Sequence, residues 1–167
     1  MQPRLDARLS RILRLMVARS FPRMRRLDIE IAWGAEEDLL YYAPRGTRYE
    51  IRVNERLRGA PRRAIEGGLA HELCHIEADM RLGRVQKRLA WERYLRSERF
   101  EMREERAVER RVIALGWGAE LLAFVRYARR LGCKFGRENG LLYGEIWQAV
   151  RGPIRMRPVR RPVVTGF

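Results

Sequence analysis

Cysteine and long apolar runs are scarce in this sequence, and their scarcity excludes several classes of protein. The 167 residues include two cysteines, Cys74 and Cys133, whose spacing fits neither a disulfide framework nor a cysteine-rich zinc site. No segment approaches the roughly 20 apolar residues that a membrane-spanning helix needs. Residues 1–20 interleave basic and apolar side chains and make a poor signal peptide. We therefore expect a cytoplasmic protein in a reducing compartment, with no membrane partner.

Lysine is nearly absent as well, although the chain is strongly basic. It occurs only at Lys87 and Lys134, so arginine supplies almost all of the 36 basic residues, which exceed the 21 acidic ones and give a formal charge of +15. Phosphate contacts need little more than an arginine-lined face, so non-specific association with nucleic acid is one expectation. The arginines are spread along the whole chain, however, and a solvated basic surface is the simpler interpretation. The sequence does not indicate an oligomeric state.

Hydrophobic periodicity divides the first third of the chain into a helix and short strands. Residues 5–21 repeat apolar side chains every three or four positions, which predicts an amphipathic helix. Between residues 27 and 54 the pattern alternates, which predicts three strands around residues 29–31, 39–43 and 48–54. Because turn-forming residues separate these strands, we expect an antiparallel meander.

Helical periodicity returns after the strands and continues through most of the remaining sequence. It predicts four helices, over residues 61–83, 90–115, 119–131 and 142–150. The expected fold is therefore α+β, with an N-terminal helix, a small, mainly antiparallel three-stranded sheet and a group of C-terminal helices. Residues 1–151 are expected to form one domain, and residues 152–167, rich in proline and arginine, an extended basic tail.

The two histidines of the chain lie four residues apart in the segment His71-Glu72-Leu73-Cys74-His75. Residues at this spacing share one face of a helix, so both imidazoles can bind one metal ion, as the HExxH pattern requires. Glu72 is turned by one residue and can act as a general base on a metal-bound water. Two structural histidines would give this arrangement only by coincidence, so we expect a metal site.

Glycines in the same helix indicate how closely it packs. Gly67 and Gly68 each cost about 1 kcal/mol relative to alanine inside a helix, which suggests the close approach of a second helix. Cys74 points away from the two histidines, and we interpret it as a buried apolar residue.

A catalytic zinc ion usually has three protein ligands, and the chain lacks a third histidine. Zincins that complete their site with a downstream histidine are thereby excluded, and a carboxylate or a thiolate must serve instead. Extending the apolar stripe of residues 90–115 backwards from Leu115 places Glu105 within the stripe. A carboxylate on a buried face needs a compensating charge, which a zinc ion supplies. Glu105 is therefore the expected third ligand of one zinc ion, with Glu104 as its rival.

The HExxH helix, followed about thirty residues later by the segment Glu105-Arg106-Ala107-Val108-Glu109, resembles the gluzincins, zinc metallopeptidases that combine HExxH with a glutamate helix. The resemblance spans roughly residues 27–131. It implies a zincin-like fold, with His71, His75 and Glu105 as zinc ligands and Glu72 as the general base. Glu109 takes a position where the family has aspartate and would orient a ligand histidine. Alternatively, Glu109 is an exposed carboxylate beside the neighbouring arginines.

The function that the motif and the resemblance imply is zinc-dependent hydrolysis of peptide bonds in a peptide or protein substrate. The alternating strand at residues 48–54 is a candidate for pairing with an extended substrate. Tyr127 and Tyr143 are both candidates for stabilising the oxyanion, and the sequence does not choose between them. Two alternatives stay open: a basic nucleic-acid-binding protein with a structural HExxH helix, and a latent enzyme whose tail fills its own cleft.

Overall fold

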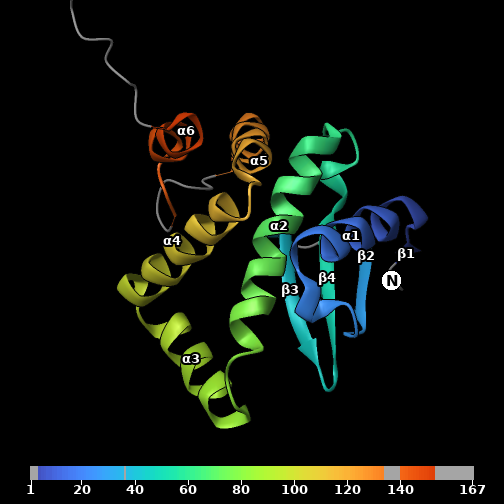
Figure 1. Ribbon diagram of the computed structural model, residues 1–167, viewed down its shortest axis with the longest axis vertical. Helices are drawn as coiled ribbons and strands as arrows, with labels where there is room; N and C mark the ends of the chain where they lie inside the picture. The colour runs from blue at the N-terminus through green and yellow to red at the C-terminus, as the bar shows by residue number, and fades with distance from the viewer. Residues whose placement is uncertain (1–3, 36, 134–139, 153–167) are drawn as a thin grey trace, which may run out of the picture.

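The computed structural model describes residues 4–35, 37–133 and 140–152 (Figure 1). Within these ranges the chain forms six α-helices and a small mixed sheet, which confirms the α+β prediction. The predicted tail lies outside the described residues, except for Gly152. The elements follow one another as β1 (Arg4–Leu5), α1 (Ala7–Ser20), β2 (Ile29–Gly34), β3 (Leu40–Arg45), β4 (Arg48–Asn54), α2 (Arg62–Asp79), α3 (Arg84–Arg96), α4 (Glu98–Ala114), α5 (Gly118–Arg130) and α6 (Tyr143–Arg151).

The sheet is mixed, so the prediction of an antiparallel meander is wrong. Its order is β1-β2-β4-β3, in which β4 pairs with β2 in parallel and with β3 in antiparallel fashion. The three main strands lie where the alternation predicts them, but β4 inserts between the other two. Ile51 and Val53 of β4 are completely buried, and a central strand with neighbours on both edges provides that burial better than an edge strand.

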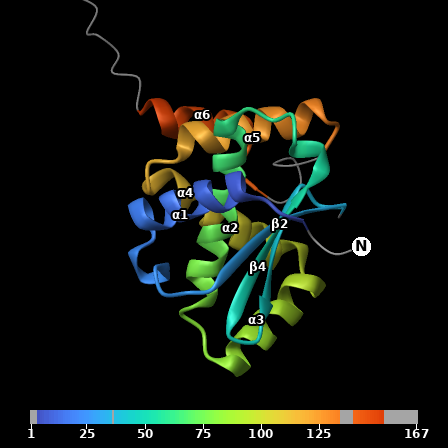
Figure 2. The ribbon, with the colours of Figure 1, turned by 90° about the vertical axis from the view of Figure 1, so that its right-hand side faces the viewer.

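Helix α1 begins at a side-chain cap and packs beside the sheet. The Asp6 carboxylate accepts hydrogen bonds from the backbone N–H groups of Arg8 and Leu9 and from the indole N–H of Trp33 on β2. The apolar stripe of the helix is buried, and α1 contacts both β2 and α2 (Figure 2). The predicted N-terminal helix is thus confirmed.

Helix α2 runs through the middle of the molecule, with the sheet on one side and α3 and α4 on the other (Figure 1). It packs most extensively against α5. A Cβ atom at Gly67 would lie 2.1 Å from the carbonyl oxygen of Glu120 in α5, so only glycine allows this approach. The close helix packing expected from Gly67 and Gly68 is therefore confirmed.

The single helix predicted over residues 90–115 is wrong, because the chain breaks at Ser97 and forms α3 and α4. Ser97 has an extended backbone, and its hydroxyl accepts a hydrogen bond from the N–H of Phe100, which caps α4. Such serine caps compete with continuous helix. Figure 1 shows α3 and α4 meeting at an angle beside α2. None of the described helices combines the length and apolar character needed to cross a bilayer.

Candidate metal centre

Three side chains from two helices meet inside the molecule: His71 and His75 of α2, and Glu105 of α4. The Nε2 atom of His71 lies 3.0 Å from Nε2 of His75 and 3.1 Å from Oε2 of Glu105. Nε2 of His75 lies 3.2 Å from Oε1 of the same carboxylate. The group is largely shielded from solvent, since His71 is only 4% exposed. These residues, which we call the metal-binding group, could hold a metal ion.

The spacing of the donor atoms in the metal-binding group fits a zinc ion. Ligand atoms at the usual distance from a tetrahedral zinc ion lie about 3.3 Å from one another. The two histidine Nε2 atoms, 3.0 Å apart, come close to this value, and they lie 3.1 and 3.2 Å from the two different oxygens of the Glu105 carboxylate. With one ligand atom taken from each residue, all three atoms lie within 4.8 Å of one another. Two imidazole nitrogens and one carboxylate are also donor types that zinc accepts. An ion could thus enter among these atoms with small side-chain movements.

Burial and mutual contact shift the pKa values within the group. Burial opposes the charged form of Glu105, but hydrogen bonds with His71 and His75 outweigh it and hold the pKa of this carboxyl well below its usual range. Burial likewise opposes the charged form of His71, but the hydrogen bond with Glu105 outweighs it and raises the pKa of His71 to about 9. An ionised carboxylate in the interior supplies charge that a bound cation can neutralise.

Glu72 follows His71 on α2 and is also buried, with an exposed fraction of 7%. Burial is the main reason why the pKa of its carboxyl is raised, while the charges of His71 and His75 act in the opposite direction. Its role as general base stays a prediction. Cys74 is buried as expected, and burial raises the pKa of its thiol to about 12.

Glu104, the rival ligand, and Glu109, the residue expected to orient a ligand histidine, have different positions. The Glu104 side chain is 42% exposed and pairs with Arg103, so the structure brings Glu105 and not Glu104 to the histidines. Glu109 is completely buried, so its interpretation as an exposed carboxylate is wrong. One of its oxygens accepts a hydrogen bond from the N–H of Leu141. That Glu109 also orients a ligand histidine stays a prediction.

Two tyrosines that the sequence did not single out contact the metal-binding group. The hydroxyl of Tyr94, on α3, donates a hydrogen bond of 2.7 Å to Oε1 of Glu105. The Tyr94 ring also stacks on Trp91, with centroids 5.8 Å apart. The Tyr42 ring, on β3, stacks on His75 with centroids 5.7 Å apart. No sequence signal marks these tyrosines, because their contacts depend on how α3 and β3 fold beside α2.

The tyrosines proposed for the oxyanion have other contacts. The hydroxyl of Tyr143 accepts a hydrogen bond of 2.6 Å from Arg126 of α5. The hydroxyl of Tyr127 lies near Gly59, in the segment before α2. The structure gives neither of them a contact that supports the oxyanion role, which stays a prediction.

The strand predicted to bind substrate is not at an edge of the sheet. β4 pairs with β2 on one side and with β3 on the other, so no substrate segment can pair with it. The edges of the sheet are formed by β1 and by β3, and β3 also contacts α2. The alternating apolar and charged residues of 48–54 suggested a half-exposed edge strand. In the structure they give the central strand β4 one apolar, buried face and one charged face.

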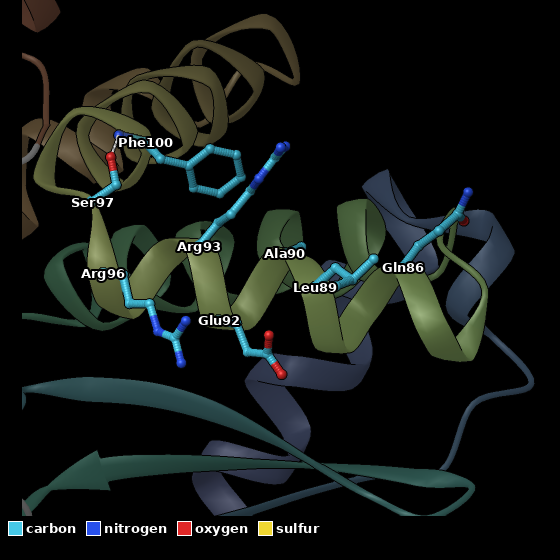
Figure 3. A pocket seen from close by; sticks show the side chains of 8 residues that line it. All are labelled: Gln86, Leu89, Ala90, Glu92, Arg93, Arg96, Ser97 and Phe100. Carbon is cyan, nitrogen blue, oxygen red and sulfur yellow. Dashed lines mark hydrogen bonds between the residues drawn. The ribbon is translucent and has the colours of Figure 1, made fainter.

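A groove of about 460 Å³ lies along α3 and the start of α4. It is formed by Gln86, Leu89, Ala90, Glu92, Arg93, Arg96, Ser97 and Phe100, none of which belongs to the metal-binding group (Figure 3).

Comparisons with protein-family models, curated proteins and solved structures find no match for this chain. The metal-binding group is therefore the feature of the described structure that indicates a function.

Proposed function

We propose that this protein is a zinc-dependent metallopeptidase that binds one zinc ion through His71, His75 and Glu105. The observation that carries the proposal is the meeting of Glu105 with both histidines of the HExxH motif. Glu105 comes from a different helix and lies 30 or more positions from either histidine in sequence, yet its oxygens are about 3 Å from their Nε2 atoms. The gluzincin resemblance of the two segments agrees with this arrangement.

The number and type of ligands favour a catalytic ion over a structural one. Structural zinc sites have four protein ligands, whereas catalytic sites have three and leave one position for water. Among the described residues, the donor group contains three members. Two histidines and one carboxylate also occur in iron(II) oxygenases. The glutamate that directly follows the first histidine is what favours a zinc hydrolase, because it provides a base beside the ligands.

The residues of the chain divide the chemistry among them. A bound zinc ion would supply a Lewis acid that activates water and polarises the scissile carbonyl. Glu72 would take the proton of the attacking water on its carboxylate and then pass it to the leaving amine. Tyr94 would hold the Glu105 carboxylate in place through its hydroxyl.

Of the two edge strands, β3 is the one that contacts the metal-binding group and could bind an extended substrate there. An exposed strand edge offers unpaired N–H and C=O groups, which a peptide segment can join as an additional strand. Tyr42 of β3 stacks on His75, so the strand reaches the metal-binding group. A peptide on β3 would therefore pass beside the histidines, and this is the substrate path that we propose.

Metal analysis and activity assays on matched variants test the proposal. We expect about one zinc per chain in the wild type and in Glu104→Gln, and little in Glu105→Gln. Glu72→Gln should retain zinc but cleave a broad peptide library about 10²- to 10⁴-fold more slowly, the usual contribution of a general base.

Three outcomes would contradict the proposal. The first is a protein with less than about a tenth of an equivalent of zinc that regains none when zinc is added. The second is iron in place of zinc in the protein as isolated. The third is a Glu72→Gln variant that cleaves peptides as fast as the wild type.

A further inference from the structure

The segment from Ala7 to Leu27 has an unusual concentration of positive charge. It contains seven arginines and neither aspartate nor glutamate: Arg8, Arg11, Arg14, Arg19, Arg23, Arg25 and Arg26. All seven are exposed. Because residues three and four positions apart share a helix face, Arg8, Arg11 and Arg14 lie on one side of α1, away from the middle of its buried stripe. Arg19 lies about three turns after Arg8, and its guanidinium is 4.8 Å from the ring centroid of Trp117. We call these four, Arg8, Arg11, Arg14 and Arg19, the α1 arginine face.

The arginines of this segment differ from many others in the chain in their lack of acidic partners. On the strands and on α4, arginines such as Arg48 and Arg111 form ion pairs with Glu30 and Glu77. None of the seven forms an ion pair with another described residue. Asp6, at the start of the helix, uses its carboxylate for the helix cap and for Trp33. The positive charge of the α1 arginine face is therefore not neutralised within the described fold.

A hollow of about 220 Å³ lies at the first half of this face. It is lined by Arg8, Arg11, Ile12 and Leu15 of α1 and by Arg62 of α2. Arg62 donates from Nε to Glu66, which leaves other N–H groups of its guanidinium for a further acceptor. Guanidinium groups bind phosphate oxygens through paired N–H donors, so the hollow has the chemistry of a phosphate site.

The other side chains of α1 indicate which kind of polyanion the α1 arginine face suits: a single strand, a membrane or a duplex. Proteins that bind single strands stack bases on aromatic rings, and α1 has no aromatic residue. Helices that lie on membranes insert their apolar side, but the apolar stripe of α1 is buried in the core, and only Leu15, 53% exposed, stands out as a large apolar side chain on the face. A duplex needs only phosphate contacts.

We propose that the α1 arginine face binds the phosphate backbone of a nucleic-acid duplex. From Arg8 to Arg19 the helix rises about 16 Å, and a DNA duplex of that length carries about nine phosphate charges. Helix α1 and helix α4, which supplies Glu105, lie on opposite sides of α2 (Figures 1 and 2). The duplex site is thus separate from the metal-binding group, and it requires no metal.

Binding of a fluorescent 20-base-pair DNA duplex to the full chain tests this proposal. The variant carries Arg8→Gln, Arg11→Gln and Arg14→Gln. The matched control carries Arg99→Gln, Arg110→Gln and Arg130→Gln, which remove the same charge from exposed arginines of α4 and α5. At about 100 mM salt we expect a 10- to 100-fold weaker affinity for the first variant and a change below about threefold for the control. The slope of log affinity against log salt should fall by about 2.7, or 0.9 for each lost phosphate contact.

Several results would overturn the proposal. Equal losses in the two triple variants would assign binding to net charge alone, and absent binding at about 50 mM salt would remove it altogether. Tighter binding to oligo(dT), or to vesicles with 30 mol% phosphatidylserine, would assign the face to single strands or to membranes. The single variant Arg11→Glu repeats the test if the triple variant does not fold. We expect Glu105→Gln to lose zinc but to bind the duplex with the affinity of the wild type. The test of the metal site and the test of the α1 arginine face can therefore fail independently of each other.

Discussion

Tyr94 connects helix α3 to the metal-binding group through a single hydroxyl. That hydroxyl donates to Oε1 of Glu105, the oxygen nearer to His75, while Oε2 faces His71. Hydrogen-bonded partners of this kind orient a ligand and favour one of its oxygens for the metal. Tyr94 thus acts on the metal through Glu105 and is a positioning residue.

Replacement of Tyr94 by phenylalanine should therefore weaken metal binding without removing a ligand. We expect about a 10-fold loss of zinc affinity in Tyr94→Phe, the lower end of what such outer partners contribute. Competition with a chromophoric chelator measures this directly. Tyr127→Phe is the control, since the hydroxyl of Tyr127 lies near Gly59 and its loss should leave the affinity unchanged. Equal affinities in Tyr94→Phe and the wild type would exclude the positioning role.

The residues of the site differ in how far the sequence could predict them. His71, Glu72 and His75 depend on spacing within one helix, which is a local property. Glu105 could be predicted as a ligand because it lies within an apolar stripe of its own helix. Tyr42 and Tyr94 could not be predicted, because their contacts with the metal-binding group arise only in the folded arrangement of β3, α3 and the neighbouring helices.

At the level of whole elements, the contact between α2 and α5 depends on Gly67. Gly67→Ala would force its Cβ into the carbonyl group of Glu120, which is backbone and cannot rotate away. We expect a loss of at least about 2 kcal/mol in the free energy of unfolding, because overpacking outweighs the gain in helix propensity. Gly144→Ala in α6 meets no atom within 4 Å and should be neutral or stabilising by up to about 1 kcal/mol. Urea denaturation of both variants measures the difference; similar values for the two would contradict the close contact.

Helix α1 depends on Asp6 in a way that should vary with pH. The hydrogen bond from the Trp33 indole, followed by that from the N–H of Leu9, lowers the pKa of Asp6 below its usual value of 3.8. A lowered folded-state pKa means that the stabilisation is fully present above the unfolded-state value and is lost as the pH falls through the folded-state value. At pH 7, Asp6→Ala should cost about 1–2 kcal/mol.

The control for Asp6 is Asp6→Asn, which retains a good helix cap but has only one oxygen to share between the cap and Trp33. It should lie between the wild type and Asp6→Ala in urea denaturation at pH 7. At about pH 3 the cost of Asp6→Ala should be smaller than at pH 7, by the linkage given above. A cost that does not change with pH would show that the charge of Asp6 contributes nothing.

The elements themselves were predicted better than their arrangement. Alternating apolar residues mark strands equally well in parallel and antiparallel sheets, so the pattern could not reveal that β4 inserts between β2 and β3. The break at Ser97 was missed because apolar periodicity continues on both sides of it. One serine cap is a weak signal beside two favourable helical segments, yet the turn that it forms brings Tyr94 of α3 to Glu105 of α4.

Across the whole molecule, a strongly basic protein buries acidic residues at its centre. The net charge is +15, and most of the arginines lie at the surface, while Glu72, Glu105 and Glu109 are shielded beside two histidines. Buried carboxylates cost free energy unless positive charge compensates them. Without a metal, Glu105 has the protonated form of His71 for this purpose. A divalent cation would provide stronger compensation and would link α2 to α4.

Zinc should therefore stabilise the folded chain as a whole. At a free zinc concentration about 1,000 times the dissociation constant, binding to the folded state alone adds about 4 kcal/mol. For a protein of this size, that corresponds to an increase in melting temperature of about 8–16 °C. Thermal melts after EDTA treatment, with and without added zinc, measure the shift. Magnesium prefers oxygen ligands and should not reproduce the increase in melting temperature. The variant His75→Gln should abolish the increase, because it lacks one of the three proposed zinc ligands. A wild-type protein that melts at the same temperature with zinc as with EDTA would show that the metal-binding group holds no zinc.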